Sequence, residues 1–288
     1  MHGGPLPESP PDLPPLRDVI ARHGLGARRK MGQNFLLDLN LTGRIARAAG
    51  SLTDVTVIEI GPGPGGLTRA LLETDVKKVI ALERDERCIA ALQELAAVYP
   101  DRLRIVAGDA LQIDPTTLAD PGDPASKLKI VANLPYNIAT PLLIKWLRQA
   151  NAYAGMTLMF QKEVAQRLAA SPGDKSYGRL SIIAGWLCKI EALFDISPRA
   201  FVPPPKVTST VVGFAPRAQP LAPARMEVLE RVTAAAFGQR RKMLRSSLKS
   251  ISNDPAALLL SCGLDPTARA EEIDIGAFCA LARAIEEN

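Results

Sequence analysis

The chain has 288 residues, 47% of them hydrophobic and 23% charged, with a net charge of +5 and a pI near 9.1. This length can bury a full hydrophobic core and predicts one large domain with a smaller one attached, or two domains of modest size. No apolar run approaches the roughly 18 to 20 residues that a membrane span requires, so we expect a soluble, cytoplasmic protein. The four cysteines form no C-x-x-C pair, and the only histidines are His2 and His23. We therefore expect no disulfide framework, no metal site and no histidine general base.

The predicted elements begin after a proline-rich segment. The first fifteen residues contain six prolines and no apolar signal-peptide core, so 1–15 is predicted to be a disordered leader. A basic stretch at 28–30 and the sequence QNFLLD at 33–38 come next. They precede a helix that we expect to end near Ala49.

From residue 54 onward, strands are predicted to alternate with helices. Runs of β-branched and apolar residues predict short buried strands at 54–60, 78–82, 103–107 and 129–132. Helices are predicted between the first three of them, over 67–72 and 85–98. This alternation predicts a parallel α/β sheet of Rossmann-like type.

The second half of the chain is predicted to mix helices and strands before it becomes entirely helical. Thr140-Pro141 supplies a capping hydroxyl and a proline at the first helical position, so we expect a helix to begin there. Further strands are predicted at 157–160, 180–186 and 207–214. The segment 215–224 is rich in proline and small residues, which predicts a linker. The predicted domains are an α/β domain over 16–215 and a small helical domain over 216–288.

A glycine-rich turn, GPGPGG at 61–66, follows the first strand. It has the G-x-G-x-x-G spacing of a dinucleotide site, with Gly61 and Gly63 as its first two glycines. Pyrophosphate binding needs backbone N–H donors, and the two prolines of the turn remove two of them. S-adenosylmethionine has no phosphate and fits this turn better, and Glu59 can place a carboxylate below its cationic methionine end.

Two acids follow the next two strands. Glu83 lies 22 residues after Gly61, close to the roughly 20 expected for an acid that accepts from ribose hydroxyls. Asp109, followed by Ala110, is placed to accept from the adenine amine of the cofactor. Each acid taken alone could equally cap a helix. Together with Glu59 and the glycines, they predict a cofactor site at the carboxyl edge of the sheet.

The tetrapeptide Asn133-Leu134-Pro135-Tyr136 follows the fourth strand, at the edge where open α/β folds place reactive groups. Taken alone it could be only a proline turn. The N6 lone pair of adenine is delocalised into the ring, and two acceptors that hold its N–H groups would localise the pair on nitrogen. The Asn133 side-chain oxygen and the Leu134 carbonyl can serve in this way, while Pro135 stiffens the turn and Tyr136 offers a face to a flipped base. No strong base is then required.

A second aromatic residue is a candidate for the other face of that base. Phe201 precedes three prolines, Pro203 to Pro205, which form a rigid turn. The alternative interpretation places Phe201 in the hydrophobic core, and the sequence leaves both interpretations open.

Seven motifs occur together in a consistent order from about residue 28 to the C-terminus, and they resemble those of the ribosomal RNA adenine dimethyltransferases. They are QNFL (33–36), EIGPG (59–63), NLPYN (133–137), QKEVA (161–165), YGRL (177–180), FVPPPKV (201–207) and the segment 237–248. The resemblance implies a class I methyltransferase fold that binds S-adenosylmethionine. It also implies transfer of two methyl groups to each of two adjacent adenosines near the 3′ end of small-subunit ribosomal RNA, in an immature ribosomal subunit. We expect the enzyme to be monomeric.

The resemblance also implies roles for particular residues. The cofactor contacts that it implies are Gln33, Asn34, Leu36, Gly61, Glu83, Asp109, Ala110 and Asn133. The target base is expected at the tetrapeptide 133–136. The sequence departs from the family pattern after Gly63, where Pro64 and a doubled glycine replace the usual larger apolar residue.

Positive charge is clustered near the C-terminus. The segment 217–249 holds eight Lys or Arg against two Glu, and 251–288 holds seven acids against two Arg. Such a run can be only a solvated helix face, but it can also attract a polyanion. The segment Phe237 to Arg245 resembles the helical start of the family's RNA-docking domain, so Arg240, Arg241 and Lys242 are predicted to contact phosphate.

Three alternative functions remain open. A macrolide-resistance methylase of large-subunit ribosomal RNA shares the fold and an Asn-x-Pro-Tyr motif, although Leu134 and the segment 237–248 favour the small-subunit enzyme. A DNA adenine or protein glutamine methyltransferase would more often carry two adjacent prolines after the first polar residue. A non-catalytic RNA-binding assembly factor would be expected to have lost the glycine turn or Asn133.

Overall fold

A computed structural model describes residues 13–26, 33–120 and 127–287 of the protein. The basic stretch 28–30 and most of the predicted leader lie outside these ranges. Leu13 packs against the hydrophobic core, and the Pro14 carbonyl accepts a hydrogen bond of 2.7 Å from the Arg69 guanidinium. Among the described residues, no helix is both long and apolar enough to cross a membrane.

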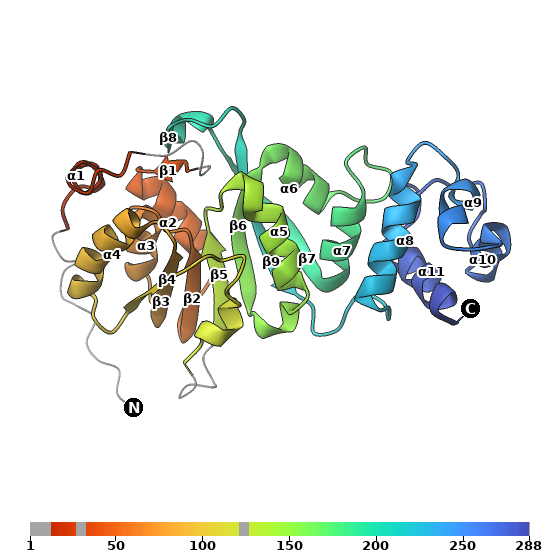
Figure 1. The fold of residues 1–288 in the computed structure, drawn as a ribbon, viewed down its shortest axis with the longest axis horizontal. Coiled ribbons are helices and arrows are strands. Elements are labelled where there is room, and N and C mark those ends of the chain that lie inside the picture. Colours follow the sequence, from red (N-terminus) through yellow and green to blue (C-terminus); the bar gives the residue numbers. More distant parts are fainter. Residues whose placement is uncertain (1–12, 27–32, 121–126, 288) are drawn as a thin grey trace.

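The described residues form a seven-stranded sheet with strand order β4-β3-β2-β5-β6-β9-β7 (Figure 1). The first five strands in this order are parallel, as the alternation of strands and helices predicts, whereas β9 pairs antiparallel with both β6 and β7. The strands are β2 (Val55–Ile60), β3 (Lys78–Glu83), β4 (Leu103–Ala107), β5 (Lys127–Ala132), β6 (Gly155–Gln161), β7 (Cys188–Ile196) and β9 (Ser209–Pro216).

Helices cover both faces of the sheet because its central strands are apolar on both sides. In β2, Val55 and Val57 belong to one buried cluster, and Ile58 and Ile60 belong to the other. The first face is covered by α2 (Leu39–Ala48), α3 (Gly66–Leu72) and α4 (Glu86–Val98). The second is covered by α5 (Tyr136–Leu147), α6 (Lys162–Ala169) and α7 (Arg179–Leu187).

A second, two-stranded sheet lies at the carboxyl edge of the large sheet. It joins β1 (Phe35–Leu36) to β8 (Phe201–Val202) in antiparallel register, with Leu36 opposite Phe201. Ahead of it, α1 (Leu16–Arg22) docks on α4 through an ion pair of 2.9 Å between Arg22 and Glu94. The described residues that precede 27–32 are thereby held against the helices on one face of the sheet.

Two predictions for the second half are wrong. The run 180–186, predicted as a strand, lies in helix α7, and strand β7 follows it. A continuous apolar run fits a buried helix as well as a buried strand, and here its surroundings decide. Helix α5 begins at Tyr136 instead of Thr140, so Pro141 lies inside the helix and forgoes the hydrogen bond to the carbonyl four residues earlier.

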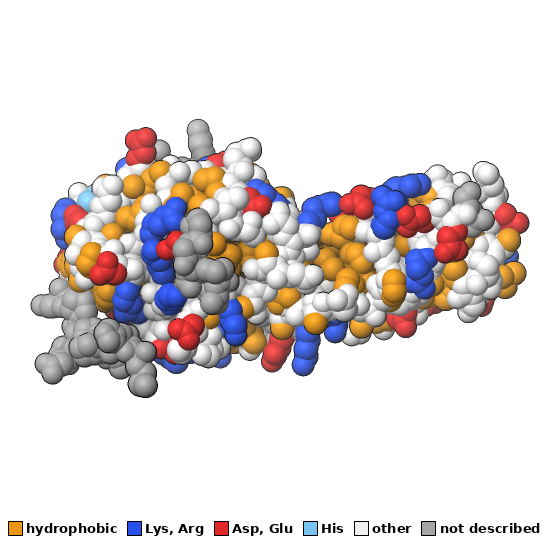
Figure 2. Space-filling view, turned by 90° about the horizontal axis from the view of Figure 1, so that it is seen from below, with side chains coloured by type: hydrophobic (Ala, Val, Ile, Leu, Met, Phe, Trp, Pro, Cys, Tyr) orange, Lys and Arg blue, Asp and Glu red, His pale blue; other side chains and the backbone are white. Residues whose placement is uncertain are grey.

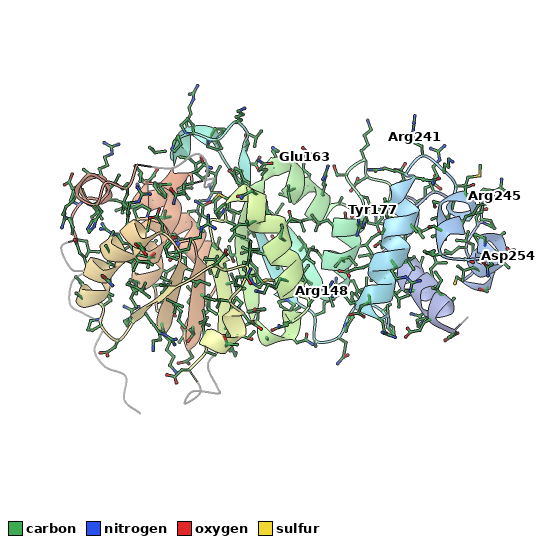
Figure 3. All side chains as sticks on the ribbon, viewed as in Figure 1. Arg148, Glu163, Tyr177, Arg241, Arg245 and Asp254 are labelled. Carbon is green, nitrogen blue, oxygen red and sulfur yellow. The ribbon has the colours of Figure 1, made fainter. Side chains whose placement is uncertain are left out.

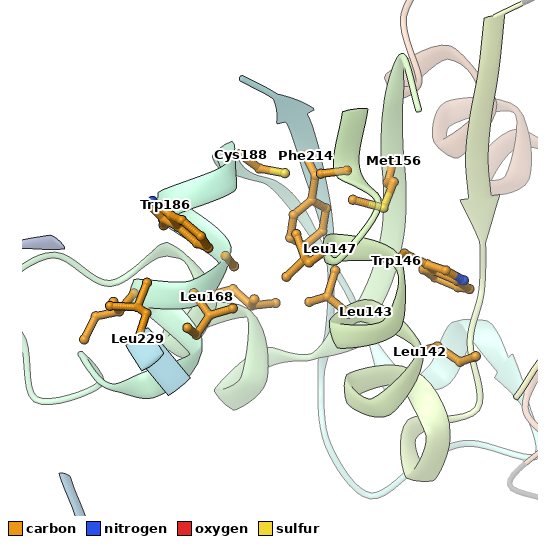
Figure 4. Packing of buried hydrophobic residues seen from close by; sticks show 14 of the residues in the cluster. Leu142, Leu143, Trp146, Leu147, Met156, Leu168, Trp186, Cys188, Phe214 and Leu229 are labelled. Atoms are coloured by element: carbon orange, nitrogen blue, oxygen red, sulfur yellow. The ribbon is translucent and has the colours of Figure 1, made fainter. Parts of the chain in front are cut away.

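The C-terminal region is helical, as predicted, with helices α8 (Met226–Gly238), α9 (Leu244–Ser247), α10 (Pro255–Ser261) and α11 (Ile275–Glu287). Its core continues without a break from the sheet: Phe214 of β9, Trp186 of α7 and Leu229 of α8 belong to one buried cluster (Figure 4). Seen from below, these helices form a narrower lobe beside the larger one (Figure 2). Helix α7 belongs to the predicted α/β domain, yet it packs against both α8 and α11.

Candidate active site

A cavity opens at the carboxyl edge of the parallel strands, beside the two-stranded sheet, with about 960 Å³ of empty space that is partly open to solvent. It has the size of a small-molecule site. The structure brings together here every residue that was predicted to bind the cofactor or to form the catalytic tetrapeptide. They are Gln33, Asn34, Leu36, Glu59, Gly61, Gly63, Glu83, Asp109, Ala110, Asn133, Leu134, Pro135 and Tyr136.

The glycine turn needs its glycines for two physical reasons. Gly61 and Gly63 have φ angles of +66° and +58°, in the left-handed region that other residues rarely adopt. The N-terminal segment also lies directly on the turn. A Cβ at Gly66 would come within 2.6 Å of the Leu36 carbonyl oxygen, and one at Gly63 within 2.9 Å of the Phe35 ring. The turn and the segment 33–36 therefore form one wall of the cavity.

Glu83 fastens the glycine turn to the end of β3. Its Oε2 accepts from the Gly63 N–H at 3.1 Å, and its Oε1 accepts from the N–H groups of Arg84 and Asp85 at 2.8 and 2.9 Å. A carboxylate has about four lone-pair positions, so it can still accept from ribose hydroxyls. Asp85 is the residue that caps α4, so Glu83 is not the helix cap.

Glu59 is a buried carboxyl group at the cavity wall. Its side chain is 1% exposed, and its Oε2 has no hydrogen-bond partner among the described residues. Burial raises the pKa of Glu59 to about 8, with the nearby Glu83 carboxylate adding to the increase and the Thr68 hydroxyl acting in the opposite direction. A buried acceptor without a donor is costly. A cationic ligand in the cavity would relieve that cost, so the site fits the sulfonium and ammonium groups of S-adenosylmethionine.

Asp109 stands on a tight loop after β4. Its Oδ1 accepts from the Leu111 N–H at 2.9 Å within a turn, and no helix begins there among the described residues, so Asp109 is not a helix cap. Its Oδ2 lies 3.8 Å from the Arg84 guanidinium, and the side chain is 37% exposed. Asp109 therefore shapes its own loop and still presents an acceptor to the cavity.

Asn133 is oriented by the N-terminal segment. Its Nδ2 donates a hydrogen bond of 3.1 Å to the Asn34 backbone carbonyl. A carbonyl only accepts, which fixes which end of the Asn133 amide faces Asn34. The Oδ1 atom is consequently left to accept from a ligand. Two segments 99 residues apart in sequence thus build one acceptor.

Tyr136 is held at its hydroxyl end. Its Oη lies 2.5 Å from the Ser209 Oγ, at the start of β9, and Ser209 is fully buried. Burial raises the pKa of Tyr136, although the hydrogen bond with Ser209 works in the opposite direction. The phenol is thereby fixed at one edge, and the half-buried ring lines the cavity.

Phe201 occupies a different place from the one predicted for a base-stacking residue. It is 2% exposed, lies in the core with Leu36 and Ile196, and is not among the described residues that line the cavity. The core interpretation therefore holds. Phe201 lies opposite Leu36 in the pairing of β8 with β1, so it contributes to the site by supporting Leu36.

The basic residues 240–242 lie far along the molecule, between α8 and α9. The segment 237–245 is not one helix as predicted: α8 ends at Gly238, and a turn precedes α9. Arg241 lies on the upper side of the helical lobe, the same side as Glu163 at the start of α6 (Figure 3). Arg240 makes an ion pair of 2.7 Å with Glu271, whereas Arg241 and Lys242 are exposed.

Some residues of the site had no signal in the sequence. Ser209 lies between two threonines at the start of an ordinary strand, and only the fold brings it to Tyr136. Leu82, Arg84 and Ile138 also line the cavity. Their positions within two residues of Glu83 or Tyr136 are the only sequence feature that could have indicated them. Among the described residues, no cluster of His, Cys, Asp and Glu could hold a metal ion.

The mixed seven-stranded sheet, with a glycine turn and buried carboxylates at the carboxyl edge of its parallel strands, has the fold of the Rossmann-like methyltransferases. The family model of ribosomal RNA adenine dimethylase matches residues 24–287. The chain belongs to this family. Membership confirms the predicted fold class, the predicted cofactor and the predicted enzyme activity on ribosomal RNA adenine.

Curated relatives share most of the chain. A "Ribosomal RNA small subunit methyltransferase A" of Rhodospirillum rubrum is 64% identical over 97% of this chain and 95% of its own. A relative of the same name from Xanthobacter autotrophicus is 59% identical, with 94% of this chain and 93% of its own covered.

Solved structures have the same fold. A dimethyladenosine transferase from Plasmodium falciparum matches with a TM-score of 0.70 and 24% identity, over 86% of this chain and 95% of that chain. The 23S rRNA methyltransferase ErmE matches with a TM-score of 0.67 and 26% identity, over 88% and 100%.

Proposed function

We propose that this enzyme dimethylates the N6 amines of two adjacent adenosines near the 3′ end of small-subunit ribosomal RNA. The name shared by relatives up to 64% identical supports the small subunit as the substrate. We further propose that the enzyme acts as a monomer in the cytoplasm, on an immature subunit.

The observation that carries the proposed chemistry is the orientation of Asn133. Because its amide nitrogen is committed to the Asn34 carbonyl at 3.1 Å, its oxygen is presented as an acceptor for one N–H of the target amine. The Leu134 carbonyl, the next backbone acceptor in the same turn, is proposed to hold the second N–H. Holding both N–H groups localises the lone pair on nitrogen and sets the direction of attack.

We assign each part of the cofactor to the residue whose chemistry fits it. Glu59 faces the cationic methionine end, Glu83 accepts from the ribose hydroxyls and Asp109 accepts from the adenine amine. When bound, S-adenosylmethionine supplies an electrophilic methyl group on a sulfonium, which leaves as a neutral thioether. Glu59 is kept away from bulk water, so its interaction with a cation is stronger than it would be at the surface.

The remaining chain groups position the base, and none of them has to take up the proton. Tyr136, pinned by Ser209, offers a ring face on which the flipped adenine can stack. In each transfer the N6–methyl bond forms as the methyl–sulfur bond breaks, and the nitrogen then loses one proton to water. No side chain has to act as a strong base, so positioning and polar contacts supply most of the rate enhancement.

The proposal is tested with labelled S-adenosylmethionine and two substrates, immature small subunits that lack the modification and large subunits. Nucleoside analysis should detect dimethyladenosine in the small-subunit RNA alone, and reverse transcription should stop at two adjacent adenosines near its 3′ end. Label in the large subunit alone would favour the macrolide-resistance activity. No transfer, with both substrate and cofactor shown to bind, would refute the enzyme hypothesis.

A further inference from the structure

The loop that follows β4 carries two of the proposed cofactor contacts, Asp109 and Ala110, at an exposed place in the fold. Among the described strands, β4 is the outermost on its side of the sheet and pairs only with β3. The sheet therefore supports this loop from one side, through the Gly108 N–H, which donates to the Glu83 carbonyl at 2.8 Å. Any support from the other side must come from outside the sheet.

That support comes from a lysine on α5. The Lys145 ammonium group donates to three backbone carbonyls of the loop, those of Ala110 at 3.4 Å, Leu111 at 2.8 Å and Ile113 at 2.9 Å. An ammonium group has three protons, so these contacts use its full donor capacity. Lys145 is half-buried and lies outside the cavity lining.

Lys145 and Asp109 hold opposite ends of one peptide group. The carbonyl of Ala110 accepts from Lys145, and the N–H of the same peptide, on Leu111, donates to Asp109 Oδ1 at 2.9 Å. A charge at each end polarises the peptide and strengthens both hydrogen bonds. The orientation of the Asp109 carboxylate is thus coupled to the position of the lysine.

Packing within the loop, and a second side chain near the end of α5, also hold the loop in place. A Cβ at Gly108 would come within 2.3 Å of the Ile113 side chain, so the loop folds tightly over its own glycine. Gln149, one turn beyond Lys145, donates to Asp114 Oδ2 at 2.9 Å. The loop is therefore fixed to the C-terminal end of α5.

Helix α5 begins at Tyr136, directly after the proposed acceptors. Nine residues separate Tyr136 from Lys145, which corresponds to about 13 Å along a helix. Helix α5 therefore carries a residue of the proposed target-base site at its start. Near its last turn, the same helix holds the loop that follows β4.

We propose that Lys145 is a positioning residue for the adenosine end of the cofactor: through three backbone carbonyls it holds the loop that presents Asp109 and Ala110. This inference rests on the proposed function for the placement of the cofactor. It concerns binding in the absence of RNA, so it can fail while methyl transfer stands.

The test measures the affinity of the whole protein for two ligands by titration calorimetry without RNA. S-adenosylmethionine is compared with 5′-methylthioadenosine, which lacks the amino-acid end. We expect Lys145→Met to weaken both by about tenfold, since it removes charge-assisted hydrogen bonds. With saturating S-adenosylmethionine, kcat should stay near the wild-type value while KM rises. Lys145→Arg, which keeps the charge and several donors, should recover part of the affinity.

The matched control is Lys129→Met. Lys129 is also half-buried and donates to two backbone carbonyls, those of Ala49 at 2.7 Å and Ser51 at 3.0 Å, but at the amino end of the strands. Its replacement should leave both affinities unchanged. Wild-type affinities in Lys145→Met, or equal losses in Lys129→Met, would overturn the proposal. So would a loss for S-adenosylmethionine alone. If Lys145→Met does not fold, Lys145→Gln must show the increase in both Kd values, and wild-type values in Lys145→Gln would equally overturn the proposal.

Discussion

The parallel half of the molecule and the antiparallel, helical half hold their proposed functional residues in different ways. In the parallel half, Glu59, Glu83 and Asn133 each lie at or next to the carboxyl end of a strand, and the sheet brings these ends together. In the other half, Arg241 and Lys242 stand on a turn between α8 and α9, which is placed by packing of α7, α8 and α11. The first arrangement is built from local units, and the second depends on contacts between distant segments.

Asn133→Ala should have the largest effect. Without the acceptor oxygen, we expect methyl transfer to fall by about a thousandfold, in the range found when a positioned polar group is removed from an active site. RNA retention should be little changed, because the base is only one of many contacts. Single-turnover kinetics and filter binding measure the two quantities. Asn151→Ala, at an exposed position, is the control. Equal losses of transfer and retention would mean that Asn133 is structural.

Glu59→Gln should weaken binding of S-adenosylmethionine by about tenfold, since the change removes a buried charge next to a cation. In the wild type, the free protein holds a proton on Glu59 below about pH 8, and cation binding displaces it. The affinity should therefore rise with pH from 6 to 8 in the wild type and vary less in the variant. A pH profile of Kd that is identical in both proteins would contradict this role.

The same substitution should stabilise the protein without ligand. The pKa of Glu59 is about 8 when folded, against 4.5 as its ordinary value. Between these values the folded state binds more protons than the unfolded state, so the contribution of Glu59 to stability falls as pH rises. We expect the Tm of Glu59→Gln to exceed that of the wild type by about 3 °C or more at pH 8.5, with a smaller difference at pH 5.5. Calorimetric scans at the two pH values measure this.

Replacement of Arg241 and Lys242 by glutamine should weaken RNA binding and reduce its salt dependence. Each lost phosphate contact lowers the slope of log K against log[salt] by about 0.7 to 0.9, so the pair should reduce it by about 1.5. Arg240→Gln should change the slope less, because Arg240 is engaged with Glu271. An unchanged slope in the double variant would refute phosphate contact at this turn.

Tyr177→Phe should have the smallest effect, and it probes the junction of the two halves. Tyr177 lies between α7 and α8, with its ring against Phe237, and its buried hydroxyl has no partner among the described residues (Figure 3). Removal of an unpaired buried hydroxyl should raise the unfolding free energy by about 1 kcal/mol. A loss of stability in denaturant titrations would show that the hydroxyl has a partner in solution.

The sequence by itself determined the strand-turn-helix units of the parallel half and most of the polar residues around the cavity. A buried strand followed by glycines or by an acid is a short-range pattern, so β2 to β6 and residues such as Glu83 and Asn133 could be located without tertiary information. It also indicated which cofactor the turn would accept, because the two prolines remove donors wherever the turn lies.

Only the tertiary structure decided features that depend on distant partners. The apolar run 180–186 became a helix because α8 and α11 cover it, Phe201 became core because β8 pairs with β1, and Arg240 found Glu271. Ser209 and Lys145 had no local signal, and the motif around Asn34 did not show that its carbonyl orients Asn133, since each of these contacts joins segments far apart in the chain. A residue's chemistry can be inferred from its neighbours in sequence, but its partners across the fold are set by how the elements pack.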